Sequence, residues 1–203
     1  AYSTCQGRSW AVHLVDLDLS GPADGWAVGD KYYVWSDPDR FKGIAVRISG
    51  GKCRLARVPN VGRSFKLEAV SIEPGGKFAW AVGGVAQRKE RYGLVIRYEK
   101  RWRRVDVPGP AGLQWELKDI DCPAPEQCWA VGHIIYPRWT EPGRPPHLRP
   151  ENADTLLVLS YRDGKWRRER VPAAPPEVVE PAFSTVVFPT PELGWVAGKG
   201  MIY

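Results

Sequence analysis

Apolar and polar residues alternate along several short segments of this chain of 203 residues. Alternation with a period of two is typical of a β-strand that buries one face. A short turn rich in proline, glycine or aspartate follows each segment, and a second apolar segment follows the turn. We therefore predict an all-β fold, with alternating strands at residues 14–19, 65–72, 115–122 and 183–188.

The apolar segment after each turn contains a phrase of five residues that occurs four times. The first copy is Gly-Trp-Ala-Val-Gly at 25–29, and close variants stand at 79–83, 128–132 and 194–198. Similarity at a period of roughly 20 to 50 residues marks stacked units that bury their faces against one another. Alternation sends the tryptophan to the opposite face from the small residues beside it. We predict that four tryptophans pack between neighbouring units: Trp26, Trp80, Trp129 and Trp195.

Two more strand-like segments complete the unit. An apolar run lies at 44–48, 94–98 and 156–161, and a closing segment that ends in Val-Pro lies at 53–59, 102–108 and 166–172. Gly50-Gly51 and Asp163-Gly164, which stand between them, are strong hairpin signals because both turn residues need positive φ. Four antiparallel strands in a unit of about 40 to 50 residues are the pattern of a β-propeller blade.

The two ends of the chain complete this pattern. Residues 1–16 align with the third and fourth strands of a blade, and residues 173–203 contain the first two. Joining the termini in one blade removes the sheet edges that an open array leaves exposed. We predict a single domain over residues 1–203, a β-propeller of four blades at 17–59, 60–108, 109–172 and 173–203 plus 1–16.

Four cysteines indicate the compartment. Cys122 and Cys128 flank the turn Pro-Ala-Pro-Glu-Gln, which brings them close enough for a disulfide and leaves a poor zinc site. Cys5 and Cys53 become neighbours if the ring closes, where they either form a bridge or remain two small buried thiols. Disulfides form in oxidising compartments, so we expect an extracytoplasmic protein.

The remaining composition restricts the partners. The net charge is +6, an excess that attracts acidic partners but is too small to indicate nucleic acid. The longest apolar stretches have the length of strands, so we expect no transmembrane segment. Numbering begins at Ala1 inside an expected strand, which agrees with a mature chain whose targeting segment has been removed.

Two pairs of aspartates lie on first strands, in the first unit and in the third. In a ring of four blades these units face each other, so the carboxylates converge near the axis. Oxygen ligands there suit a hard cation such as calcium; the alternatives are hydrogen bonds to backbone or plain solvation. Asp16 and Asp119 are thus the candidate metal ligands, with Asp18 and Asp121 beside them, although we predict no bound metal or cofactor.

The segments that join second to third strands contain most of the irregular sequence. They lie at 30–43, 85–93 and 134–154, and in a propeller all three open on one face. Aromatic residues and arginines on rigidly mounted loops are typical of protein-recognition sites, whereas the alternative is a loop that only caps the ring. The predicted partner-binding residues are Tyr33, Trp35, Arg40, Arg88, Arg91, Tyr92, Arg138, Trp139, Arg144 and His147.

Catalytic patterns are not found in the sequence. The three histidines, His13, His133 and His147, stand in different contexts, and no nucleophile-elbow, zinc-protease or phosphate-loop motif occurs. The sequence from Ser160 to Trp166 approaches the Asp-box of sialidase-like propellers but differs in spacing and lacks the threonine. We predict that the chain is not an enzyme.

The unit as a whole resembles the propeller repeats of photosystem II assembly factor-like and BNR-like exported bacterial proteins. The version Cys-Pro-Ala-Pro-Glu-Gln-Cys-Trp-Ala-Val-Gly, at 122–132, is similar to cysteine-bracketed repeats of secreted actinobacterial proteins. Those rings are larger as a rule, so closure by one chain and a ring of eight blades from two chains both stay open. The resemblance implies a non-catalytic binding or assembly role outside the cytoplasm.

Three functions follow in order of preference. The first is a scaffold that docks a protein partner or a membrane complex through its basic, aromatic loop face. The second is a carbohydrate-binding propeller, in which tryptophans in four similar grooves stack on sugars. The third is a glycosidase-like enzyme.

Overall fold

The computed structural model describes residues 11–33, 37–87, 90–135, 155–175, 178 and 181–203. All regular structure in these residues is β-strand, as the sequence predicts. The described chain contains no helix with the length and apolar character needed to cross a bilayer.

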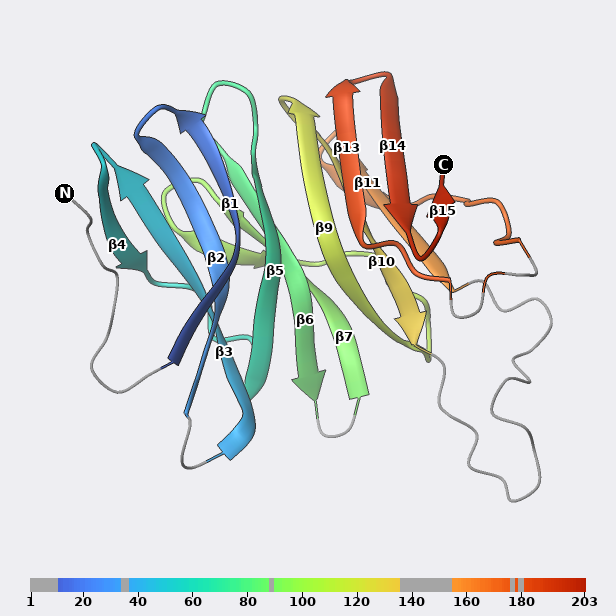
Figure 1. Ribbon diagram of the computed structural model, residues 1–203, viewed down its shortest axis with the longest axis horizontal. Coiled ribbons are helices and arrows are strands. Elements are labelled where there is room, and N and C mark those ends of the chain that lie inside the picture. The colour runs from blue at the N-terminus through green and yellow to red at the C-terminus, as the bar shows by residue number, and fades with distance from the viewer. Residues whose placement is uncertain (1–10, 34–36, 88–89, 136–154, 176–177, 179–180) are drawn as a thin grey trace.

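The strands group into four consecutive antiparallel units (Figure 1). The first two units share one hydrogen-bonded sheet because Lys42 and Phe65 form a parallel pair between them. The first unit contains β1 (Ala11–Gly21), β2 (Asp24–Tyr33), β3 (Asp37–Ser49) and β4 (Lys52–Ala56). The second contains β5 (Ser64–Ile72), β6 (Ala79–Gln87), β7 (Glu90–Tyr98) and β8 (Trp102–Val105). The third contains β9 (Gln114–Ala124), β10 (Gln127–Ile135), β11 (Leu156–Arg162) and β12 (Lys165–Arg168), and the fourth β13 (Thr185–Thr190), β14 (Leu193–Gly198) and β15 (Met201–Ile202).

Within the units the predicted hairpins are present. Gly50 and Gly51 have φ of 56° and 71°, and Asp163 and Gly164 have φ of 53° and 75°. Two consecutive positive φ values give the turn whose twist matches that of the flanking strands. These two hairpins therefore join third to fourth strands as the sequence indicates.

The last glycine of each phrase allows a close approach between first and second strands. A Cβ at Gly29, Gly83 or Gly132 would lie 1.9–2.1 Å from a backbone oxygen of the first strand of the same unit. The first strand carries a β-bulge beside this glycine in each of these three units. A bulge inserts one residue and changes which face the following side chains occupy.

Three of the four predicted tryptophans pack between units, whereas Trp195 of the last unit is 50% exposed, contrary to the prediction. Trp26 contacts Tyr98 and Trp102 of the second unit, with ring centroids 4.5 and 5.0 Å apart. Trp80 repeats this contact in the next junction, with Tyr161 and Trp166 at 4.6 and 5.4 Å. Trp129 instead stacks on Phe188 of the fourth unit, at 4.7 Å. Each junction thus forms its own apolar core from one face of a unit and the opposite face of the next.

Side-chain oxygens on the first strands also join the units. Asp18 Oδ2 accepts a hydrogen bond from the Ile72 backbone N–H at 2.7 Å, and Asp121 Oδ2 accepts one from Phe188. In the junction between them, Ser71 Oγ accepts from the Cys122 backbone N–H at 3.1 Å. The same position of the repeat therefore performs the same bridging role three times.

The N-terminal segment requires a correction. We expected residues 1–16 to supply outer strands of the last blade, but Ala11 to Asp16 lie in β1 and pair with β2 of the first unit. The long strand β2, which pairs with β3 on its other side, extends beyond the phrase and provides this segment with a local antiparallel partner. The third strand of the fourth unit comes from Met201 and Ile202 instead. Residues 1–10 lie outside the described part of the chain.

Candidate binding site

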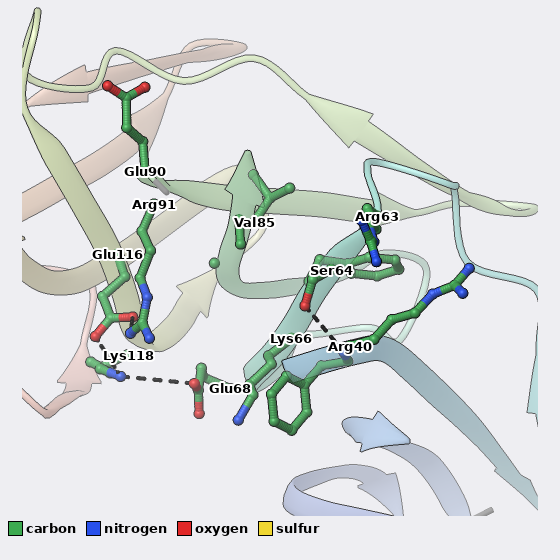
Figure 2. Close-up of a pocket in the computed structure, with 14 residues that line it drawn as sticks. Arg40, Arg63, Ser64, Lys66, Glu68, Val85, Glu90, Arg91, Glu116 and Lys118 are labelled. Carbon is green, nitrogen blue, oxygen red and sulfur yellow. Dashed lines mark hydrogen bonds and ion pairs between the residues drawn. The ribbon is translucent and has the colours of Figure 1, made fainter. Parts of the chain in front are cut away.

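A pocket of about 780 Å³ opens where the first three units meet (Figure 2). This volume falls in the usual range for ligand sites, about 300–1,000 Å³. Its walls come from strands β3, β5, β6, β7 and β9 and carry five cationic and three acidic side chains. The cationic residues are Arg40, Arg63, Lys66, Arg91 and Lys118, and the acidic ones are Glu68, Glu90 and Glu116.

The strand extensions that hold the pocket were expected to be loops. Residues 30–33 continue β2 and residues 37–43 continue β3, with Asp30 paired to Gly43 and Tyr32 to Phe41. In the second unit, Val85 pairs with Tyr92 and Gln87 with Glu90. The predicted loops at 30–43 and 85–93 are therefore mainly long hairpins, because their residues keep the antiparallel register beyond the core. Arg40 and Arg91 project from strands.

The β-bulges of the first strands direct charged residues to the pocket. Glu68 is the extra residue between Leu67 and Ala69, and Lys118 is the extra residue next to Leu117. The two leucines are fully buried, whereas their charged neighbours line the pocket. Glu116, one position before the buried Leu117, also faces the pocket.

On one side of the pocket the acidic groups are already paired with cations. Lys118 Nζ lies 2.9 Å from Glu116 Oε1 and 3.8 Å from Glu68 Oε1. Arg91 Nη1 lies 3.7 Å from Glu116 Oε2, and His133 Nε2 lies 3.2 Å from Glu116 Oε1. Figure 2 shows Glu116, Lys118 and Glu68 as a connected series along this wall. The cations here neutralise the carboxylates of the protein itself.

On the other side, two cations have no carboxylate partner among the described residues. Arg40 is exposed, and Lys66 holds its Nζ 3.7 Å from the centroid of the Phe41 ring. The backbone N–H of Phe41 donates to Ser64 Oγ at 3.0 Å, which ties β3 to β5 beside these residues. A guanidinium, an ammonium and an aromatic ring together suit an acidic group on an amphipathic segment.

His133 adds a titratable group behind the pocket wall. Burial lowers its pKa below the ordinary value of 6.5; Glu116 opposes this effect, and the cations Lys118, Lys199 and Arg91 reinforce it. Its Nδ1 is buried without a hydrogen-bond partner in the described structure. The imidazole is thus held in its neutral form more strongly than a solvent-exposed histidine.

Of the ten predicted partner-binding residues, the structure brings Arg40 and Arg91 together in the pocket. Tyr92, the next residue in β7, is half-buried against two apolar cores, and its hydroxyl donates to Glu90 Oε2 at 2.5 Å. The backbone of Tyr33 ends β2. Six others lie outside the described residues: Trp35, Arg88, Arg138, Trp139, Arg144 and His147.

The pocket residues of β5 and β9 are not among those predicted from the sequence. Lys66 and Glu68 flank Leu67, and Glu116 and Lys118 flank Leu117. Equivalent leucines of two units thus each stand between a basic and an acidic residue, in reversed order. This repeated charge pattern is the signal that identifies them. Its direction in space depends on the bulges, which the sequence does not reveal.

The candidate metal ligands bind backbone in this structure. Asp16 Oδ2 accepts from the Val70 backbone N–H at 2.8 Å. Asp119 Oδ2 accepts from the Val186 backbone N–H at 2.7 Å and from the Thr185 hydroxyl at 2.9 Å. Burial raises the pKa of Asp119 despite these hydrogen bonds. Within the described chain these carboxylates join successive units, and no group of three or more metal-ligating side chains occurs.

The predicted disulfide between Cys122 and Cys128 is present, with the two Cα atoms 4.0 Å apart across the β9–β10 turn. Cys53 is also disulfide-bonded. Its expected partner, Cys5, lies outside the described residues. The oxidised state of these cysteines is compatible with the predicted extracytoplasmic location.

The junction tryptophans do not form the four equivalent grooves that the carbohydrate hypothesis requires. Trp26 and Trp80 are 2% and 1% exposed, and Trp129 is half-buried under Phe188. A sugar stacks on an open aromatic face. Of the four, Trp195 alone is largely exposed, at 50%.

Comparison with known proteins gives little further information. No family model and no curated protein matches the chain. A solved structure described as "YCF48 bound to D1 peptide" aligns with 98% of this chain and 95% of its own, at 12% sequence identity and a TM-score of 0.35. A structural similarity this weak gives no information about function or partner. The all-β architecture itself is what the repeat resemblance predicts.

Proposed function

We propose that this chain is a non-catalytic scaffold of the β-propeller type that docks a protein partner, or a subunit of a membrane complex, through the pocket between its first three units. The part of the partner that enters is an acidic segment with apolar or aromatic residues nearby. The proposed site combines the strand extensions that carry Arg40 and Arg91 with residues of β5 and β9, and it takes the place of the loop face expected from the sequence.

One observation carries the proposal: Arg40 and Lys66 lie at the pocket beside Phe41 without a carboxylate partner, whereas Glu68 and Glu116 opposite are ion-paired with Lys118. The pocket therefore has an excess of positive charge that the described residues do not neutralise. Such a surface attracts an acidic partner and orients it during encounter. Rigid strands hold these groups in place, which reduces the ordering cost of binding.

Two further features support the proposal. The Glu116 carboxylate contacts both Lys118 and His133, which favours a structural over a catalytic role for this group. The disulfide at Cys122 and Cys128 supports a location outside the cytoplasm, where such bonds persist.

The proposal is tested with a fluorescein-labelled peptide of glutamate and tyrosine residues, titrated with the protein while fluorescence anisotropy is recorded. We expect Arg40→Glu/Lys66→Glu to weaken binding at least about tenfold, the equivalent of about 1.4 kcal/mol. The control, Arg103→Glu/Arg104→Glu, makes the same charge change at exposed positions of β8 outside the pocket. Equal losses in both variants, or no binding by the wild-type protein, would count against the proposal.

A further inference from the structure

Exposed apolar side chains gather at the two ends of the row of units. Of the large apolar residues that are exposed in the described structure, all but Leu55 belong to β1 or to the fourth unit. We call Leu14, Leu17 and Leu19 the leading patch; they are 43%, 57% and 48% exposed. We call Val187, Leu193, Trp195 and Ile202 the trailing patch; they are 51%, 56%, 50% and 73% exposed.

The strand register shows that the leading patch is buried in the other units. Leu14 stands opposite Gly29, as Leu67 stands opposite Gly83 and Leu117 opposite Gly132. Leu67 and Leu117 are 0% exposed, because the preceding unit packs over them.

The next leading-patch position gives the same result. Leu17 stands opposite Ala27, and its equivalents Val70 and Ile120 are each 4% exposed. The leading patch therefore has the composition of an inter-unit junction whose preceding unit is missing.

The trailing patch is the other half of the same junction. Trp195 is the tryptophan of the fourth phrase, and its equivalents Trp26 and Trp80 are buried by the unit that follows them. Ile202 pairs with Ala197, as the buried Ala45 pairs with Val28 in the first unit. The register indicates that Trp195 would pack against the third and fourth strands of a following unit. At the corresponding positions the first unit has Ile48 and the disulfide-bonded Cys53.

The polar groups of the two patches also match. In the second junction the side chain of Ala69 offers no hydrogen-bond acceptor to the next unit. The Ile120 backbone N–H of that unit instead donates to the side chain of its own neighbour, Asp119 Oδ1, at 2.8 Å. The leading patch already has this arrangement, since the Leu19 backbone N–H donates to Asp18 Oδ1 at 2.8 Å. The leading patch therefore needs no side-chain acceptor at this position, and Val187 of the trailing patch provides none.

A second polar match involves Thr185. This residue pairs with Ala197 as Asp16 pairs with Val28, and Asp16 accepts from the Val70 backbone N–H of the next unit. The Thr185 hydroxyl donates to Asp119, which leaves its oxygen able to accept. The corresponding donor on the leading side is the Leu17 backbone N–H.

We infer that a second copy of this chain covers both patches, with the leading patch of each copy against the trailing patch of the other. The occupant is a second copy because one chain presents both complementary halves, and the second and third units separate them (Figure 1). The contact joins different surfaces head to tail, and it closes when two chains of four units complete one ring. This inference does not depend on the proposed function.

Solution mass tests the inference directly, by light scattering on a size-exclusion column. The wild-type chain, 22.8 kDa, is expected to elute with the mass of two chains. Leu17→Glu and Trp195→Glu each place a charge in one patch and are expected to give single chains with unchanged far-ultraviolet circular dichroism. The control, Ala111→Glu, adds the same charge at an exposed turn between units and is expected to keep the two-chain mass.

Mixing the two variants distinguishes a head-to-tail contact from other dimers. Leu17→Glu retains an intact trailing patch and Trp195→Glu an intact leading patch, so an equimolar mixture is expected to recover the two-chain mass through one remaining junction. A contact between two identical patches would leave one variant dimeric by itself. That result, a mixture that stays monomeric, or a monomeric wild-type chain would overturn the inference.

Discussion

At the scale of single residues, Asp119 is a partly buried carboxylate whose loss of hydration is only partly compensated by hydrogen bonds. It accepts hydrogen bonds from the Val186 backbone and the Thr185 hydroxyl, yet burial still raises its pKa above the ordinary value of 3.8. A raised pKa means that the folded state binds the proton more tightly than the unfolded chain. Stability from this group is therefore present below pH 3.8 and is lost as the pH rises through the folded pKa.

This sign predicts the behaviour of Asp119→Asn. The substitution removes the buried charge, and the amide oxygen can still accept from the Val186 backbone N–H. We expect the variant to gain stability relative to wild type between pH 3.5 and pH 7, measured as the difference in urea midpoint at the two pH values. A difference that is constant or moves the other way would show that the buried charge has no such cost.

His133 has the opposite sign. Its pKa is lowered by burial, so the unfolded chain takes up a proton at a higher pH than the folded chain. The stability that depends on neutral His133 is complete above pH 6.5 and is lost as the pH falls through the folded pKa. We expect His133→Gln to show a smaller loss in urea midpoint than wild type between pH 7.5 and pH 5. Equal losses in the two proteins would exclude His133 as the source.

The pocket contains residues that the sequence predicts and residues that it does not. Arg40 and Arg91 were predicted from their type and their place between strands, and both line the pocket. Lys66 and Lys118 were not predicted, since a charge on an alternating strand normally indicates a solvated face. Their position in the pocket depends on bulges and on how three units meet, which are properties of tertiary packing.

At the scale of elements, the repeated phrase predicts more than its own strand. The register of Trp26 and Trp80, the hairpins at Gly50 and Asp163, and the disulfide turn all follow from local sequence and are all present. The lengths of β2 and β3 do not follow, because polar and aromatic residues at 30–33 and 37–43 read as a loop. They remain strands because most of their residues pair across the same hairpin, from Asp30 with Gly43 to Tyr32 with Phe41.

The β9–β10 turn provides a test at this scale. Cys122 and Cys128 are both buried, and their bond closes a short loop with a sequence separation of 6. For a loop this short, the chain-entropy relation gives a stabilisation of about 2 kcal/mol. We expect Cys122→Ala/Cys128→Ala to lose about that amount of unfolding free energy in urea denaturation. An unchanged midpoint would show that the turn holds its geometry without the bond.

At the scale of the whole molecule, the number of units was predictable and their closure was not. Four copies of the phrase give four units, each with its own face toward the next. The alignment of residues 11–16 with an outer strand failed, because the same alternation also suits the first strand that they form. Short strands of period two fit several positions in a sheet, and only the available partners decide among them.

The arrangement of units creates the pocket, so its function is a property of the whole molecule. Residues from β3, β5, β7 and β9 meet there although they belong to three separate units. No single repeat contains the site. Binding at this position therefore requires the assembled units.

Photo-crosslinking reports directly whether a peptide binds in this pocket. A glutamate- and tyrosine-rich peptide carrying a benzophenone group is irradiated with the protein, and the attached residues are identified by mass spectrometry. We expect adducts in the segments around Arg40, Lys66 and Arg91, and their loss in Arg40→Glu/Lys66→Glu. Adducts confined to the fourth unit, or adducts that persist in that variant, would show that the peptide does not bind in this pocket.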